Sequence, residues 1–202
     1  MKTLQFLLML TAIGFSMISC DSSAERPQFE LDLPDEIPDD NYLIYSAVFD
    51  EMYESDKIVI AQSSQTNLWL EKDNSFHEML LKNNPGFDSY LLTDLAYQNS
   101  ESLLFENKFL NHNQEFALIT SDELKYIFNG QDINDSWNEY YKSHDSNGYM
   151  RLTQIGFNKN KTQAVFEFSH HYASLGAGGF IIYLVKEDCS WLIKDIVYTW
   201  VS

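Results

Sequence analysis

The chain is poor in basic residues. It carries 13 lysines and arginines against 30 aspartates and glutamates, which gives a formal net charge of −17 at pH 7. Nucleic-acid binding depends on lysine and arginine side chains that neutralise phosphate, so this composition argues against a nucleic-acid partner. It argues equally against electrostatic attachment to anionic lipid head groups. The ordinary interpretation of the charge is a well-solvated acidic surface.

Cysteine is scarce as well, with two in 202 residues. Cys20 ends an apolar stretch, residues 4–18, that is too short to span a membrane comfortably. Ser19 precedes Cys20 and Asp21 follows it. This pattern resembles a bacterial lipobox, which implies cleavage before Cys20 and lipid on its sulfur and its new amino group. Met17 departs from the pattern, because leucine is the usual residue there. The alternative is an ordinary cleaved signal with Cys20 as an incidental thiol.

Lipid on Cys20 would hold the protein at a membrane of the bacterial cell envelope. Each buried methylene contributes about 0.8 kcal/mol, and stable anchoring needs more than one chain. Cys189 would then be the remaining thiol, so no intramolecular disulfide could form. The sequence leaves open whether the inner or the outer membrane holds the protein.

These features divide the chain into three segments. Residues 1–19 are the predicted lipoprotein signal peptide, residues 20–39 an acidic tether that contains three prolines, and residues 40–202 a single globular domain. Proline removes a backbone donor and fixes φ, which disfavours a helix or an interior strand in the tether. No second apolar run long enough for a membrane span follows the signal.

The domain is predicted to be α+β, with short helices packed on a C-terminal sheet. Apolar runs predict strands at 57–62 and 115–119, and a helix is expected to continue through 103–105. Capping patterns predict five helix starts. These lie at Asp39 or Asp40, Ser75, Asp88, Thr120 and Ser136.

Residues 149–202 are predicted to form a four-stranded antiparallel meander. Alternation in 162–172 indicates a half-buried strand, whereas 180–185 is apolar on both faces, as in a central strand. The apolar alternation changes phase in the last strand, which predicts a bulge near Lys194 and Asp195. A cone-shaped fold of the NTF2-like type is the alternative, by analogy of element order alone.

Short motifs in this half of the chain carry a resemblance. They are Gly156-Phe157-Asn158, Thr162-Gln163-Ala164, Gly176-Ala177-Gly178, Trp191 and Trp200-Val201-Ser202. Together they resemble a family of secreted or lipid-anchored bacterial proteins that has no assigned activity. The resemblance covers roughly residues 115–202 and is weak before them. Some members place a cysteine pair around the glycine-rich turn, where this chain has Ala173 and Ala177. The resemblance therefore implies a fold unit without a disulfide there, and no function.

Motifs for phosphate and calcium are incomplete. Residues 176–179 are rich in glycine, but a Gly-x-Gly-x-x-Gly pattern would need glycine at Ile181 and a helix after it. A glycine-rich connection between strands is the favoured interpretation. The segment 132–136 begins like a calcium loop, but Trp137 occupies the required glycine position and Ser143 the required glutamate position.

Catalytic constellations are missing too. His170 and His171 are adjacent on a predicted strand, so their side chains point to opposite faces and cannot easily share one metal ion. His170 is expected to be partly buried and His171 to face solvent. Acidic residues flank Cys189, which makes it a poor nucleophile candidate. No catalytic, cofactor-binding or metal-binding residue is therefore predicted, and Cys20 is the predicted lipidation site.

Aromatic residues, in contrast, are plentiful at 15% of the chain. A sugar-binding platform would need an exposed coplanar set. Trp137 with Tyr140 and Tyr141 is one candidate, and Tyr198 with Trp200 is another. Packing between helices and sheet is the favoured interpretation.

Three functional hypotheses follow. The favoured one is a non-enzymatic binding or accessory module of the cell envelope, attached to the membrane through Cys20, with an envelope protein as its expected partner. A hydrolase of envelope or external polymers is the second, and it requires a cleft lined by residues such as His170, His171 or Asp195. An immunity or inhibitor protein is the third, and it requires a clustered acidic patch that masks a basic enzyme. The oligomeric state is left open.

Overall fold

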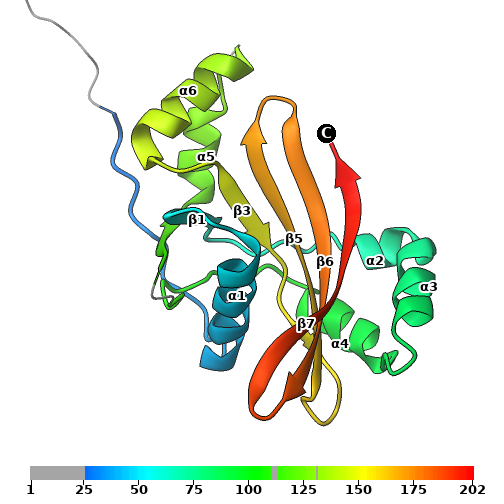
Figure 1. Cartoon of the computed structure of the whole chain (residues 1–202). Coiled ribbons are helices and arrows are strands. Elements are labelled where there is room, and N and C mark those ends of the chain that lie inside the picture. Colours follow the sequence, from blue (N-terminus) through cyan, green and yellow to red (C-terminus); the bar gives the residue numbers. More distant parts are fainter. Residues whose placement is uncertain (1–25, 111–112, 131) are drawn as a thin grey trace, which may run out of the picture.

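The computed structural model describes residues 26–110, 113–130 and 132–202. Within them, six helices and seven strands form a mixed α/β domain around one open sheet (Figure 1). The elements are α1 (Asp39–Met52), β1 (Lys57–Ala61), α2 (Trp69–Lys72), α3 (Asn74–Asn83), α4 (Tyr90–Gln98), β2 (Glu115–Ile119), α5 (Ser121–Ile127), α6 (Ile133–His144), β3 (Tyr149–Leu152), β4 (Gly156–Phe157), β5 (Gln163–Ala173), β6 (Gly176–Glu187) and β7 (Ser190–Val201).

The sheet is mixed, not wholly antiparallel. Its strands lie in the order β2-β1-β3-β5-β6-β7, and β4 also pairs with β5. β1 pairs in parallel with both β2 and β3. Parallel neighbours need crossover connections. Helices α2–α4 connect β1 to β2, and α5 and α6 connect β2 to β3. The strands predicted at 57–62 and 115–119 are confirmed, and they enlarge the sheet beyond the predicted C-terminal strands.

Residues 149–158, the start of the predicted meander, are divided into β3 and β4. Between them, the Thr153 hydroxyl donates to the Glu167 carbonyl oxygen at 3.1 Å and accepts from the Glu167 amide at 2.8 Å. A side chain thus takes a place in the hydrogen-bond ladder, which interrupts the strand. β5, β6 and β7 follow as long antiparallel strands.

β7 contains two bulges. Asp195 lies opposite Tyr183 while Ile193 lies opposite Leu184, so Lys194 is the extra residue. The bulge predicted near Lys194 and Asp195 is therefore confirmed. The second register shift leaves Thr199 as an extra residue, and the sequence pattern did not predict it.

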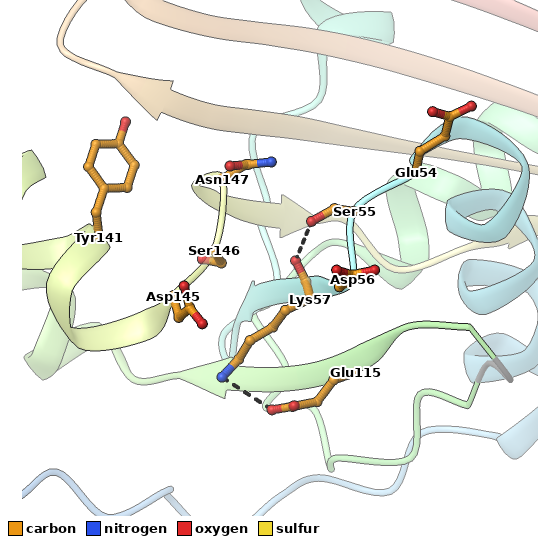
Figure 2. A pocket seen from close by; sticks show the side chains of 9 residues that line it. All are labelled: Glu54, Ser55, Asp56, Lys57, Glu115, Tyr141, Asp145, Ser146 and Asn147. Atoms are coloured by element: carbon orange, nitrogen blue, oxygen red, sulfur yellow. Dashed lines mark hydrogen bonds and ion pairs between the residues drawn. The ribbon is translucent and has the colours of Figure 1, made fainter.

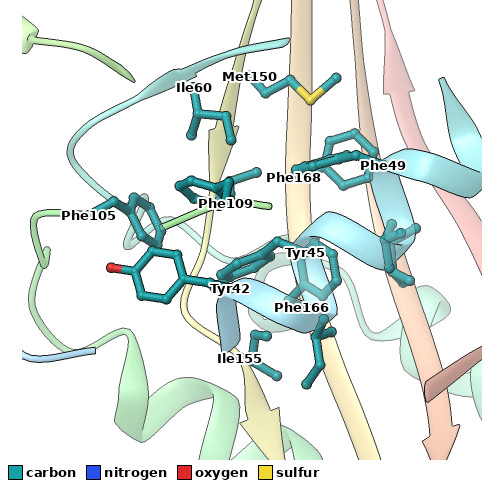
Figure 3. Packing of buried hydrophobic residues seen from close by; sticks show 14 of the residues in the cluster. Tyr42, Tyr45, Phe49, Ile60, Phe105, Phe109, Met150, Ile155, Phe166 and Phe168 are labelled. Atoms are coloured by element: carbon teal, nitrogen blue, oxygen red, sulfur yellow. The ribbon is translucent and has the colours of Figure 1, made fainter. Parts of the chain in front are cut away.

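Helix α1 covers one face of the sheet with aromatic side chains (Figure 3). Tyr45 contacts Phe166 edge to face, with ring centroids 5.0 Å apart, and Phe49 contacts Phe168 in the same way at 5.5 Å. The buried Tyr45 hydroxyl donates to the Thr153 carbonyl oxygen at 2.7 Å. Aromatic contacts of this geometry add to area burial, so these rings hold α1 on the sheet.

The opposite face of the sheet is covered as well. Leu91 and Leu95 of α4 pack with Val165 and Ile181, whose positions alternate with those of the α1 face. Further along the same face, Trp137 and the neighbouring α5 and α6 residues pack against β1 and β2. The strand predicted to be half-buried at 162–172 is thus covered on both faces over much of its length, and the odd position Glu167 is only 2% exposed.

Helix starts agree only in part with the predicted caps. Thr120 caps α5 as predicted, accepting a hydrogen bond from the Glu123 amide at 3.0 Å. Asp132 rather than Ser136 caps α6, and Asp73 rather than Ser75 caps α3. In both corrected cases an aspartate upstream of the predicted cap accepts the amide hydrogen bond. The helix expected through 103–105 is not formed, because the Leu103 amide bonds to the Ser64 side chain instead.

Residues 26–38 carry no helix or strand, as expected from their prolines, but they lie against the domain. The Gln62 side chain bonds both the amide and the carbonyl of Asp32, at 3.0 and 2.7 Å. Arg26 forms ion pairs with Glu123 at 2.8 Å and Glu139 at 3.3 Å. This part of the predicted tether follows the surface of the domain to the start of α1 (Figure 1).

Candidate functional site

An acidic cleft of about 610 Å³ lies where α1 ends and β1 and β2 begin (Figure 2). The short loop after α6 forms its opposite wall. Four carboxylates line the cleft, Glu54, Asp56, Glu115 and Asp145, with one cation, Lys57. The Lys57 ammonium lies 3.1 Å from Glu115, so the remaining carboxylates outnumber the positive charge.

Local sequence concentrates negative charge at this end of α1. The last turn of the helix has no basic residue, and Glu54 and Asp56 follow directly. A helix C-terminus carries a partial negative charge, where cations are the stabilising choice. Acidic residues in this position disfavour folding slightly and strengthen the negative potential in the cleft.

A second hollow of about 290 Å³ adjoins the cleft and shares Glu54, Ser55, Lys57 and Asn147 with it. Its other walls include Tyr53, Met150 and His170. His170 Nε2 donates to the Asn147 carbonyl oxygen at 3.0 Å, and its ring meets Tyr53 edge to face with centroids 5.3 Å apart. Burial lowers the pKa of His170 below its ordinary value, so the ring is neutral at pH 7. The walls that this hollow does not share with the cleft are mostly apolar, so it is called the apolar hollow below.

The loop between α6 and β3 is fixed by its own contacts. Asp145 and Gly148 adopt positive φ, at 48° and 109°, which turns the chain sharply into β3. A Cβ on Gly148 would lie 2.1 Å from the His171 carbonyl oxygen, so this position requires glycine. The buried Tyr140 hydroxyl donates to the Gly148 carbonyl oxygen at 2.8 Å. The cleft wall is therefore held in a defined shape.

The arrangement suits binding of a positively charged group. Carboxylates in a partly enclosed site attract cations more strongly than the same carboxylates in water. Among the residues that the structure describes, no group of three or more His, Cys, Asp or Glu side chains is placed to hold a metal ion. An organic cation, such as a lysine or arginine side chain, fits the charge of the cleft and the apolar hollow beside it.

The residues required by the hydrolase hypothesis are not brought together. His170 lines the hollow beside the acidic cleft, whereas His171 lies on the other face of β5. Asp195, on β7, accepts hydrogen bonds from Asn83 at the end of α3, at 3.3 Å, and from the following Asn84, at 2.7 Å. The three candidate residues therefore lie at three separate places in the fold.

The expectation that His171 faces solvent holds only in part, because the residue is half-buried. Its ring stacks on Tyr149, with centroids 5.0 Å apart and planes 9° apart, and its Nε2 lies 3.0 Å from the Ser169 hydroxyl. Burial and the nearby Arg151 lower its pKa to about 4. The alternation pattern predicted full exposure, whereas the Tyr149 ring covers part of His171.

Neither aromatic platform forms. Trp137 and Tyr140 are buried, at 7% and 0% exposure, and Tyr141 alone of that set lines the acidic cleft. The bulge at Thr199 separates the second pair: Tyr198 lies opposite Phe180, whereas Trp200 lies opposite Gly179, and neighbouring positions of a strand face opposite ways.

The glycine-rich residues 176–179 lie inside β6 and not in a connection between strands. A Cβ on Gly179 would meet the Trp200 indole nitrogen at 2.1 Å. The glycine leaves room for the Trp200 ring to lie over the strand. The missing side chain at Gly179 thus allows the Trp200 ring of β7 to pack against β6.

The predicted lipidation site, Cys20, lies outside the described residues, as does the signal peptide. Cys189 is exposed on the turn between β6 and β7. No helix in the described part of the chain has the length and apolar character needed to cross a membrane. The lipid anchor and the envelope location stay predictions.

No protein-family model, curated protein or solved structure matches this chain. The resemblance of the C-terminal motifs to secreted and lipid-anchored proteins likewise stays a prediction.

Two features of the structure were not predicted from the sequence. The acidic cleft draws Glu115 and Asp145 from segments far from Glu54, so spacing along the chain did not show it. The signal that could have indicated it is the acidic C-terminus of α1. The buried carboxylate of Glu167 was also missed, although its position between Phe166 and Phe168 is unusual for an acid.

Proposed function

We propose that this protein is a lipid-anchored binding module of the bacterial cell envelope whose acidic cleft receives a positively charged group of a partner protein. The observation that carries the proposal is the cleft itself, with four carboxylates and one lysine beside an apolar hollow. The scattered positions of His170, His171 and Asp195 favour binding over hydrolysis.

Affinity purification of the full-length protein from cross-linked cell envelopes tests this proposal. The double substitution Glu54→Gln with Asp56→Asn removes two charges from the cleft and is expected to abolish recovery of the partner. The control, Glu30→Gln with Glu101→Gln, removes two charges from exposed positions outside the cleft and should leave recovery unchanged. Equal recovery with both double variants would contradict a role for the cleft.

The anchor is tested separately. Cys20→Ala is expected to release the protein from the membrane fraction and to abolish labelling by a fatty-acid analogue. Retention of both the label and the membrane association would show that the lipobox interpretation is wrong, whatever the cleft binds.

A second candidate is an immunity or inhibitor protein that covers a basic enzyme. The gathering of Glu54, Asp56, Glu115 and Asp145 at one end of the sheet favours it over an evenly spread acidic surface. The purified chain should then abolish the activity of its captured partner at equimolar ratio. A partner that stays fully active in the complex would exclude the inhibitor role and favour the accessory-module role.

We also propose that β3 to β7 act as one interrupted four-stranded meander, the fold unit that the C-terminal motifs suggest. The antiparallel register from β3 through β7 supports this description. The NTF2-like cone stays the alternative.

A further inference from the structure

Arg151 is an unpaired cation in a strongly acidic chain. The chain has two arginines, Arg26 and Arg151, and 30 acidic residues. Arg26 pairs with Glu123 and Glu139. Within the described residues, by contrast, the Arg151 guanidinium makes no ion pair or hydrogen bond, and its Nε is buried without a partner.

An unpaired guanidinium nitrogen in the protein interior is unfavourable. A buried polar group without a hydrogen bond has lost its contacts with water and gained none in return, and this penalty is larger when the group is charged. Such groups are rare in folded proteins and often mark a functional position. With so many carboxylates in the chain, a partner for Arg151 could have been placed beside it. Its neighbours on the same face of the sheet are Tyr149, Ser169 and His171. The nearest carboxylate on that face, Glu167, accepts the Trp69 and Leu70 amides instead.

The main chain at Arg151 is fixed on both sides. Arg151 lies opposite Ser169 in the register of β3 and β5. The Arg151 carbonyl oxygen accepts a hydrogen bond from the Gln65 side chain at 2.8 Å. The guanidinium therefore projects from a rigid strand near the middle of the sheet, which is the support that a specific binding site needs.

Arg151 lines an open concavity of about 800 Å³ between α5 and β3. Three aromatic side chains line it as well, Tyr126, Phe128 and Tyr149. Its two other charged residues, Lys125 and Asp122, bond to each other at 2.9 Å. Arg151 is therefore the charged residue of the concavity that has no partner. The concavity combines walls made of aromatic rings with one unpaired guanidinium.

We propose that this concavity is a binding site for a carboxylate carried on a ring, with Arg151 holding the carboxylate and Tyr126 and Tyr149 contacting the ring. A planar guanidinium matches a carboxylate with two parallel hydrogen bonds. Sugar acids and aromatic acids share this chemistry. The site is independent of the acidic cleft and of the lipid anchor.

The scarcity of arginine provides a direct assay. In the full-length protein labelled with ¹⁵N-arginine and held in detergent micelles, the guanidinium Nε–H groups give one NMR signal for Arg26 and one for Arg151. The spectrum of Arg151→Lys assigns them. The probes are sodium glucuronate and sodium benzoate, compared with glucose and benzyl alcohol as uncharged analogues and with sodium chloride at equal ionic strength.

The expected result is a saturable shift of the Arg151 signal by at least one of the two acids, with the Arg26 signal unchanged as an internal control. A response to glucuronate alone indicates a sugar acid, and a response to benzoate alone indicates an aromatic acid. By calorimetry, Arg151→Gln should weaken binding at least tenfold, whereas Lys82→Gln, at an exposed position on α3, should not change it. The proposal is overturned if neither acid gives a saturable shift, if both signals move alike, or if the uncharged analogues act equally.

Discussion

Glu167 makes the stability of the domain depend on pH in a predictable direction. Its carboxylate accepts main-chain hydrogen bonds from Trp69 at 2.7 Å and Leu70 at 2.9 Å, and so fastens the start of α2 to β5. The residue is 2% exposed. Burial raises its pKa from 4.5 to about 7, although the two amide donors act in the opposite direction.

The raised pKa determines the direction in which stability changes with pH. The folded state binds the Glu167 proton more tightly than the unfolded state, so its contribution to stability is complete below about pH 4.5 and is lost as pH rises through about 7. Each tenfold change in the acid dissociation constant corresponds to about 1.4 kcal/mol. The contribution lost across this range is therefore about 3 kcal/mol.

Glu167→Gln removes the titration and keeps the shape of the side chain. Its amide oxygen can still accept one of the two main-chain hydrogen bonds, as the protonated acid does. We expect the variant to match the wild type near pH 5 and to be more stable than the wild type at pH 8 by up to about 3 kcal/mol. Urea unfolding followed by tryptophan fluorescence at a series of pH values measures this difference.

Comparing variant with wild type at each pH cancels the titration of all other groups. Glu101→Gln, at an exposed position, should give a curve parallel to that of the wild type. A difference between Glu167→Gln and the wild type that stays constant from pH 4.5 to 8.5 would refute the reasoning, because it would mean that Glu167 titrates normally in the folded protein.

Two further outcomes test the packing and the neutral histidine. Gly156→Ala would place a Cβ 2.6 Å from the Leu95 amide nitrogen where β4 crosses α4, so we expect a loss of about 1–3 kcal/mol in the free energy of unfolding. The matched Gly86→Ala, with nothing within 4 Å, should lie within about 0.5 kcal/mol of the wild type. An NMR titration of His171 should show a midpoint near its lowered pKa of about 4, and a midpoint near 6.5 would contradict its burial against Tyr149.

Some local features of the fold could be predicted from the sequence. The Thr120 cap and the bulge at Lys194 each leave a mark within a few residues, as a capping pattern and as a change of phase in the apolar alternation. The bulge at Thr199 left no such mark, because Tyr198 and Trp200 keep the same parity. The parallel pairing of β1 with β2 and β3 depends on how the helical connections cross the sheet, which no local pattern specifies.

The candidate site was harder to predict from the sequence, for a physical reason. Glu54 and Asp145 are ordinary polar residues in their own segments and become one site only because α1 and α6, on opposite faces of the sheet, both end near the start of β1. Glu167 likewise has the parity of a solvent-facing residue, and it is buried because α2 docks over it. A local sequence pattern predicts which face of a helix or strand is apolar. It does not predict which other element packs on that face, and these sites form where two elements meet.

The strand β3 shows how one register sets both binding surfaces. Met150 lines the hollow beside the acidic cleft, while Tyr149 and Arg151 line the concavity next to α5. A slip of one residue would exchange the two faces and turn Arg151 toward the carboxylates of the cleft. Pairing with β1 on one side and β5 on the other opposes that slip. The separation of the acidic cleft from the unpaired guanidinium is therefore a consequence of the register of β3, the strand at which the parallel and antiparallel parts of the sheet meet.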